Sequence, residues 1–160
     1  MKRCPNCKGT EIRKVRERFV DEFPLADGPK LQFVFEDFPQ QVCARCGERT
    51  YEAKDLSAAD DAITRELVAR GVRDAAVFRH LRKTLRLKAT DLADLLGVTA
   101  ETVSRWENGH NEPERAVWVT LEQLVDDHYV GKETTLARLR ALASARVPKR
   151  PIELKLAGAR

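Results

Sequence analysis

Two cysteine pairs constrain the fold of this chain more than any other feature of its sequence. Cys4 and Cys7 form one C-x2-C pair, Cys43 and Cys46 form the second, and the 160 residues contain no other cysteine. A C-x2-C turn directs two thiolates at one point, so two such turns supply the four sulfur ligands of a tetrahedral zinc site. Four thiolates leave no open coordination position for a substrate. We therefore predict one structural zinc ion held by all four cysteines.

Disulfides and thiol redox chemistry are the alternative uses of paired cysteines. The N-terminus is polar from the start and shows no apolar signal segment, so we expect a reducing cytoplasmic location, which disfavours disulfides. A redox C-x-x-C motif normally occurs once, beside a βαβ pattern that this sequence lacks. The stability of the module also favours zinc binding, because a module of about 56 residues buries too little apolar surface to be comfortably stable alone.

The segment between the cysteine pairs has the pattern of β-strands. It contains five of the six phenylalanines of the chain. Leu31, Phe33 and Phe35 occupy alternate positions, which is the period of a half-buried strand, and the turn sequence Asp-Gly-Pro precedes them. We therefore expect a small β-rich zinc-binding module.

From Ser57 onward the apolar spacing becomes helical. The S-x-x-D sequence that begins at Ser57 predicts a helix start, Gly71 predicts its end, and several shorter helices follow. The predicted fold class is α+β, with four parts: a zinc-binding module at 1–56, a helical linker at 57–73, an all-α domain at 74–130, and a C-terminal helix with a basic tail at 131–160. Residues 152–156 are interpreted as a short strand or an unstructured arm.

The stretch LADLLGVTAETVSRWENG predicts two short helices joined by a tight turn. Gly97 permits the positive φ of the turn, Thr99 can cap the second helix, and Val103 and Trp106 form its buried face. Trp118 is likewise assigned to the core. The opposite face of the second helix carries small or hydrogen-bonding side chains that suit the major groove of DNA: Ala100, Glu101, Thr102 and Arg105.

The motif A-x-x-L-G-V-T-x-x-T-V-S-R-W-E-N-G, from Ala93 to Gly109, resembles the Cro/cI or Xre class of helix-turn-helix. The resemblance implies a five-helix, lambda-repressor-like domain whose third helix reads DNA while the following loop contacts phosphate. The sequence departs from the class at Lys88, where a Ser or Thr cap followed by Gln is common, and Thr90 is the candidate substitute. The residues nominated for base or phosphate contact are Thr90, Thr99, Ala100, Glu101, Thr102, Arg105, Asn108, Gly109 and His110.

Basic residues concentrate in two regions of a chain whose net charge is +4. Residues 79–88 hold five basic residues and no acid, which is compatible with a solvated helix face or with a phosphate-contacting surface, and Lys83 is the candidate phosphate contact. Residues 131–160 hold eight basic and two acidic residues. The arginines and lysines of the first region are Arg79, Arg82, Lys83, Arg86 and Lys88.

The remaining residues favour a binding protein over an enzyme. No histidine lies near a cysteine pair or a plausible nucleophile in the sequence, so each is interpreted as a surface residue or a hydrogen-bond donor. No apolar run approaches the roughly 18 residues of a membrane-spanning helix, so we expect no membrane partner. The three histidines are His80, His110 and His128.

Together the two cysteine pairs and the helix-turn-helix resemble the MqsA/YgiT antitoxin-type family over about residues 1–130. The resemblance implies a cytoplasmic homodimer that binds a palindromic promoter through its helical domain and a small toxin through its zinc module. We expect the dimer interface in the helices of residues 114–142, whose apolar stripe is long. Two alternatives stay open: a protein-interaction module that neutralises a partner without being a general regulator, and a thiol oxidoreductase.

Overall fold

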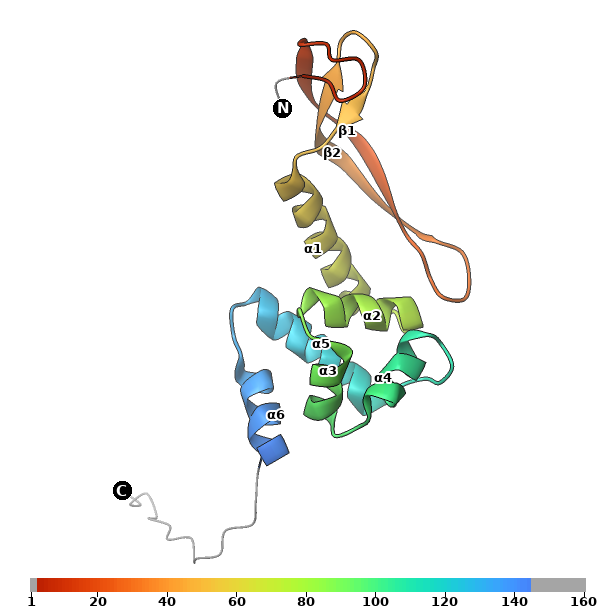
Figure 1. Cartoon of the computed structure of the whole chain (residues 1–160), viewed down its shortest axis with the longest axis vertical. Helices are drawn as coiled ribbons and strands as arrows, with labels where there is room; N and C mark the ends of the chain where they lie inside the picture. Colours follow the sequence, from red (N-terminus) through yellow and green to blue (C-terminus); the bar gives the residue numbers. More distant parts are fainter. Residues whose placement is uncertain (1–2, 145–160) are drawn as a thin grey trace, which may run out of the picture.

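The computed structural model describes residues 3–144, in which a three-stranded antiparallel sheet precedes six helices (Figure 1). This arrangement confirms the predicted α+β class. The predicted strand or arm at 152–156 lies outside the described residues. The elements are β1 (Ile12–Phe23), β2 (Leu31–Cys43), β3 (Arg49–Thr50), α1 (Ala53–Ala69), α2 (Ala75–Thr84), α3 (Ala89–Leu96), α4 (Ala100–Glu107), α5 (Arg115–Tyr129) and α6 (Thr134–Ser144).

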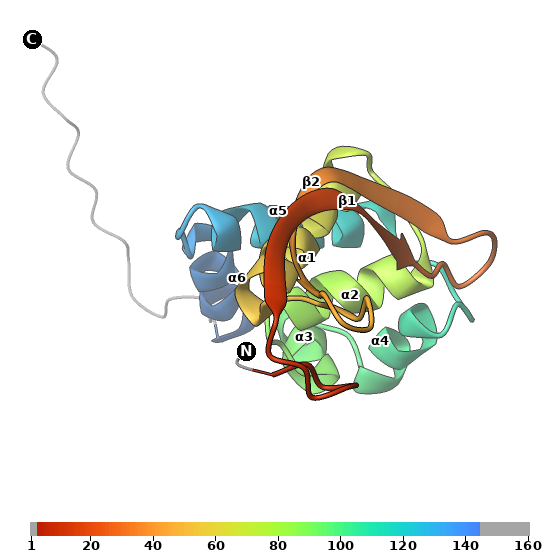
Figure 2. The ribbon, with the colours of Figure 1, turned by 90° about the horizontal axis from the view of Figure 1, so that it is seen from above.

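β1 and β2 form a long hairpin whose two faces differ in character. The predicted alternation is confirmed, because Leu31, Phe33 and Phe35 are half-buried while the residues between them are exposed. Midway along the hairpin, the ring of Phe19 stacks on that of Phe38 with centroids 4.6 Å apart. β3 pairs with residues 41 and 42, at the cysteine end of β2. Seen from above, the hairpin curves across the helices (Figure 2).

The first helix begins earlier than the sequence pattern predicts. α1 starts at Ala53, four residues before Ser57, and Glu52 is its extended N-cap residue. The chain leaves β3 at Thr50 and turns directly into good helix formers, so the S-x-x-D sequence lies inside the helix instead of capping it. The predicted end is confirmed, because Gly71 follows the helix with a φ of 61°.

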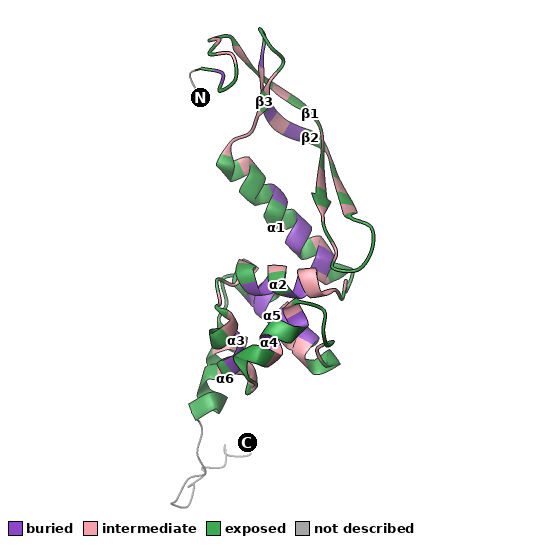
Figure 3. Cartoon of the chain, turned by 45° about the vertical axis from the view of Figure 1, so that its right-hand side comes forward, coloured by how far each residue is buried: buried purple, intermediate pink, exposed green. Residues whose placement is uncertain are grey.

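The helical core is centred on three aromatic rings. Phe78 of α2 meets Trp106 of α4 and Trp118 of α5 edge-to-face, with ring centroids 5.6 Å and 5.4 Å apart. Val103 is completely buried beside them, so the core assignments of Val103 and both tryptophans are confirmed. Leu67 of α1 belongs to the same cluster. Figure 3 shows this buried surface along one side of α1 and where the helices meet.

The hairpin is packed against the helical core instead of standing apart from it. Phe23, Leu25, Leu31 and Phe33 are partly buried against the cluster that α1, α2, α4 and α5 build. The apolar face of the hairpin therefore covers helical residues that would otherwise meet water. None of the described helices combines the length and apolar character needed to cross a bilayer.

Candidate metal centre and nucleic-acid interface

The hairpin brings the two cysteine pairs to a single point. The sulfur of Cys4 lies 3.6 Å from that of Cys46, the sulfur of Cys7 lies 3.6 Å from that of Cys43, and all four lie within 4.8 Å of one another. A tetrahedral site with metal–sulfur bonds of about 2.3 Å has sulfur–sulfur edges of about 3.8 Å. The four sulfurs therefore fit a four-coordinate metal, as the spacing of the cysteines predicts.

The two cysteine turns have the same backbone geometry. The N–H of Lys8 donates to the carbonyl of Cys4 at 3.1 Å, and the N–H of Gly47 donates to the carbonyl of Cys43 at 2.9 Å. Both donors have left-handed backbones, with φ of 60° and 74°. A β-carbon at Gly9 would lie only 3.3 Å from the nearest cysteine sulfur, so this glycine lets the backbone approach the site.

Two of the four thiols have pKa values shifted in opposite directions by their neighbours. Backbone N–H groups of Cys46 and Arg45 donate to the sulfur of Cys43 and lower its pKa to about 7. The N–H of Glu48 acts in the same direction on Cys46, but the neighbouring Cys7 sulfur, burial and the other two thiols together raise the pKa of Cys46 to about 12. Sulfurs this close to one another suit a bound cation, which would balance the charge of thiolate ligands.

The second candidate site is the exposed surface of α4. Gly97 turns the chain between α3 and α4 with a φ of 69°, and the hydroxyl of Thr99 accepts from the N–H of Thr102 at 3.1 Å. Both features agree with the sequence prediction. Because Val103 and Trp106 anchor the helix in the core, its other face is directed to solvent.

Most of the nominated DNA contacts lie on that outer surface. Arg105 and Glu101 form an exposed ion pair at 2.8 Å, one helical turn apart. The amide of Asn108 donates to the carbonyl of Ser104 at 2.7 Å, which closes the end of the helix. Thr102 is half-buried, and the nominated residues with exposed side chains or backbone are Lys83, Thr90, Thr99, Ala100, Glu101, Arg105, Asn108, Gly109 and His110.

The basic run of residues 79–88 divides into structural and solvent-facing members. Arg82 is buried, forms a two-pronged ion pair with Glu107 and donates to the carbonyl of Leu87 at 2.6 Å. It therefore ties α2 to the end of α4 and is unavailable to phosphate, which the sequence pattern did not reveal. Lys83 and Arg86 are exposed, so their side chains are accessible to phosphate.

The start of α3 explains the departure of the sequence from the helix-turn-helix pattern. Lys88 is the N-cap residue, and the carboxylate of Asp91 accepts from its backbone N–H at 3.0 Å. Asp91 thus stabilises the start of α3, a role that a Ser or Thr at the cap position has in the usual pattern. Thr90 is exposed beside it. The role of Asp91 was missed, although an acid three residues after a helix start is a recognisable signal.

His80 is a hydrogen-bond donor within the fold. The hydroxyl of Thr64 donates to the carbonyl of Asp60 at 2.8 Å, so its oxygen accepts from Nε2 of His80 at 2.7 Å. Burial lowers the pKa of His80, which favours the neutral ring. The ring also meets the edge of Phe23, with centroids 5.1 Å apart. This contact links the hairpin to α1 and α2.

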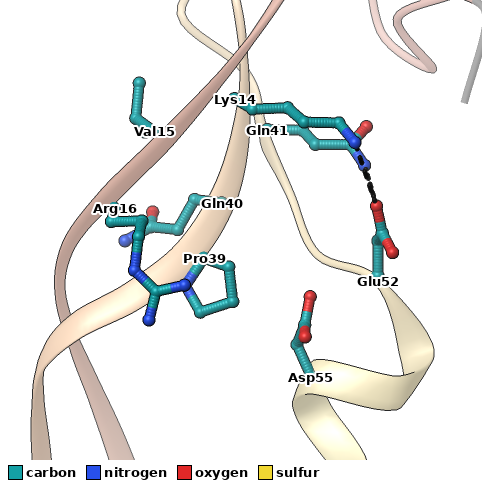
Figure 4. Close-up of a pocket in the computed structure, with 8 residues that line it drawn as sticks. All are labelled: Lys14, Val15, Arg16, Pro39, Gln40, Gln41, Glu52 and Asp55. Atoms are coloured by element: carbon teal, nitrogen blue, oxygen red, sulfur yellow. Dashed lines mark hydrogen bonds and ion pairs between the residues drawn. The ribbon is translucent and has the colours of Figure 1, made fainter.

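A cavity of about 280 Å³ lies between the hairpin and the start of α1 (Figure 4). Two of its polar side chains meet at Glu52: Gln41 donates to Glu52 at 3.0 Å, and Lys14 lies 3.9 Å from the same carboxylate. A hydrogen bond from Lys54 lowers the pKa of Glu52. The cavity is therefore a polar seam that joins hairpin and helix.

A comparison with protein families gives a match over most of the chain. The family model described as the antitoxin component of a bacterial toxin-antitoxin system, MqsA, matches residues 1–132. No curated protein sequence matches the chain. The matched range contains all four cysteines and the helices α1 to α5, and it ends just before α6.

Proposed function

This chain belongs to the MqsA antitoxin family of bacterial toxin-antitoxin systems, and from that premise we propose that it is a zinc-stabilised, DNA-binding antitoxin that represses its own promoter. The observation that carries the proposal is the coexistence of a four-sulfur centre with an anchored helix whose polar face is exposed. The proposal assigns the protein a non-enzymatic role in the cytoplasm.

Zinc is the metal that we propose for the four-sulfur centre. Tetrahedral all-thiolate sites select zinc or iron, and zinc is the usual structural ion of C-x2-C turns. Metal analysis of the purified protein should give one zinc per chain. The alternative of a thiol oxidoreductase predicts metal-free protein with titratable thiols, so the same measurement separates the two functions.

DNA recognition is proposed for the outer face of α4. A guanidinium can pair with both acceptors of guanine, and a carboxylate can accept from cytosine, so Arg105 and Glu101 are the proposed base readers. Their mutual ion pair is exposed and contributes little to stability, so it can be exchanged for base contacts. Asn108 and His110 are proposed to contact phosphate, together with Lys83 on α2.

A homodimer on a palindromic operator follows from the size of the recognition surface. One recognition helix covers only a few base pairs, so specific binding requires two half-sites about one helical turn apart. The proposed interface lies in residues 114–142. Val119 and Leu142 support it, because these apolar side chains are 55% and 71% exposed in one protomer.

The toxin is proposed to bind the zinc module. In the described part of the chain β1 pairs only with β2, so its other edge offers unpaired backbone groups to a partner strand. This edge also supports the alternative in which the protein neutralises a partner without regulating genes. Selection of duplex oligonucleotides by the purified full chain tests the DNA half: enrichment of a palindrome supports the repressor, and no enrichment leaves only the interaction protein.

A further inference from the structure

One carboxylate joins the turn of the hairpin to the helical domain. The backbone N–H of Ala26, in the turn between β1 and β2, donates to both carboxylate oxygens of Asp74 at 3.0 and 3.1 Å. The same carboxylate caps α2 by accepting from the N–H of Ala76 at 2.8 Å. Asp74 therefore holds together two segments that lie 48 residues apart in the sequence.

Apolar contacts surround this polar link. Leu25 in the turn and the flanking Phe23 and Leu31 pack against the helical core. Phe23 also meets the ring of His80 on α2 edge-to-face. The turn is consequently seated on α2 by side chains as well as by the carboxylate, as its position beside α2 in Figure 1 illustrates.

The start of α2 in turn touches the loop that follows α4. A β-carbon placed on Gly109 would lie 3.8 Å from the β-carbon of Ala75, which directly follows Asp74. Asp27 of the hairpin turn and Asn111 of the loop line the same cavity, of about 270 Å³. The hairpin turn, the start of α2 and the loop after α4 thus surround one cavity.

We infer that Asp74 is a positioning residue that clamps the hairpin turn onto α2 and thereby steadies the loop of residues 109–111. Free movement of the hairpin turn would remove one wall of the cavity that this loop lines. The loop immediately follows Asn108 at the end of α4. A second consequence rests on the proposed DNA-binding function: the clamp sets the affinity of this loop for phosphate, because a steadied loop loses less conformational entropy on binding.

Two variants and a control isolate the clamp from helix capping. Asp74→Ser keeps an oxygen that caps α2, because Ser and Asp are equally good N-cap residues, but its shorter side chain does not reach Ala26. Asp74→Asn is the matched control, since its carbonyl oxygen can accept from both N–H groups. Ala26→Pro removes the donor from the other side of the contact.

Amide hydrogen exchange on the metal-loaded full chain tests the clamp directly. We expect Asp74→Ser and Ala26→Pro to speed amide exchange in the hairpin turn and at residues 109–111 by roughly tenfold. This is the factor expected from the loss of one charge-assisted hydrogen bond. Asp74→Asn keeps one accepting oxygen but loses the charge, so its exchange should fall between that of the unmodified protein and that of Asp74→Ser. Faster exchange in the hairpin turn with unchanged exchange at 109–111 would overturn the inference.

Affinity for DNA tests the second consequence. Asp74→Ser and Ala26→Pro should weaken binding to the selected duplex and to random duplex by a similar factor of roughly three to ten, because phosphate contacts carry no sequence information. Unchanged affinity, or an equal loss in Asp74→Asn, would overturn this consequence. If the unmodified protein selects no duplex, the proposed DNA-binding function fails, and the exchange data alone still decide whether the clamp exists.

Discussion

At the scale of single residues, the metal centre depends on backbone conformations that most side chains disfavour. The two cysteine turns are equivalent, but one uses Gly47 at its left-handed position and the other uses Lys8. A residue with a β-carbon crowds the carbonyl group in this conformation, whereas glycine adopts it freely. The turn that ends at Lys8 therefore carries a backbone strain that the turn ending at Gly47 avoids.

Replacing Lys8 by glycine should relieve that strain. We expect Lys8→Gly to raise the free energy of unfolding of the metal-loaded protein by about 0.5–1 kcal/mol, the steric cost of a left-handed residue less the entropy of an added glycine. Chemical denaturation at fixed zinc concentration measures the change. The reverse variant, Gly47→Lys, should destabilise by a similar amount, and a stabilising Gly47→Lys would show that the two turns are not equivalent.

Loss of a base contact and loss of a phosphate contact should change the affinity for DNA in different ways. Arg105→Ala is expected to cost about 1–3 kcal/mol on the selected duplex and little on random DNA, because the side chain lies on the exposed face of α4. Lys83→Ala should weaken both duplexes equally and reduce the slope of log K against log salt by about 0.9 for each protomer of the proposed dimer.

Titrations of both variants across a salt series on both duplexes distinguish these outcomes. Equal weakening by Arg105→Ala on the two duplexes, or an unchanged affinity for the selected one, would mean that Arg105 reads no base. The buried Arg82 is unsuitable as a phosphate control, since its loss would leave the largely buried Glu107 carboxylate with only the longer ion pair to Arg79, at 3.7 Å.

At the scale of elements, the hairpin has two functions that meet in one structure. Its cysteine end carries the metal centre, and its turn end packs on the helical core. The sequence predicts a zinc-binding module at residues 1–56, and the contacts of Phe23 and Leu25 make part of its hairpin a cover for the helical core. Loss of metal should therefore be felt first at the cysteine end and only weakly in α2 to α5.

Cys43→Ser tests this order of events. Removing one thiolate of four should abolish zinc binding, which is worth about 10–16 kcal/mol in small zinc modules, and should unfold the N-terminal module while the helices stay folded. Metal analysis combined with amide exchange measures both parts. Ala44→Ser, an exposed change in the same turn, is the control. An intact module without metal, or collapse of both halves, would contradict the expectation.

At the scale of the whole molecule, α6 offers apolar side chains that one protomer leaves uncovered. None of its residues is buried, and Leu139 and Leu142 line an open cavity of about 430 Å³ shared with α3 and α5. The family match ends at residue 132, just before this helix. A second protomer seated on this surface would complete the proposed dimer.

Sedimentation measures whether α5 and α6 hold a dimer together. We expect a dimer at tens of micromolar and a shift toward monomer in Leu142→Glu, because a charge on an apolar contact surface costs several kcal/mol of association free energy. Ala137→Glu, also on the exposed surface of α6, is the control and should stay dimeric. An unmodified protein that is monomeric, with footprints one half-site long, would exclude this interface.

The sequence by itself determined the features that depend on residues close together in the chain. Each C-x2-C turn, the capping of α4 by Thr99 and the left-handed turn at Gly97 are local, so spacing and residue type were enough to predict them. The alternation along β2 was equally readable, because side chains on a strand alternate between faces whatever the partner.

Only the tertiary structure decided which distant residues meet. The bond from Ala26 to Asp74 and the ion pair between Arg82 and Glu107 join segments 48 and 25 residues apart, and no local pattern specifies such partners. The start of α1 belongs to the same class, since it is set by where β3 releases the chain. Burial and contact across the fold are collective properties, so they made Arg82 a structural residue although its neighbours in the sequence are solvent-facing cations.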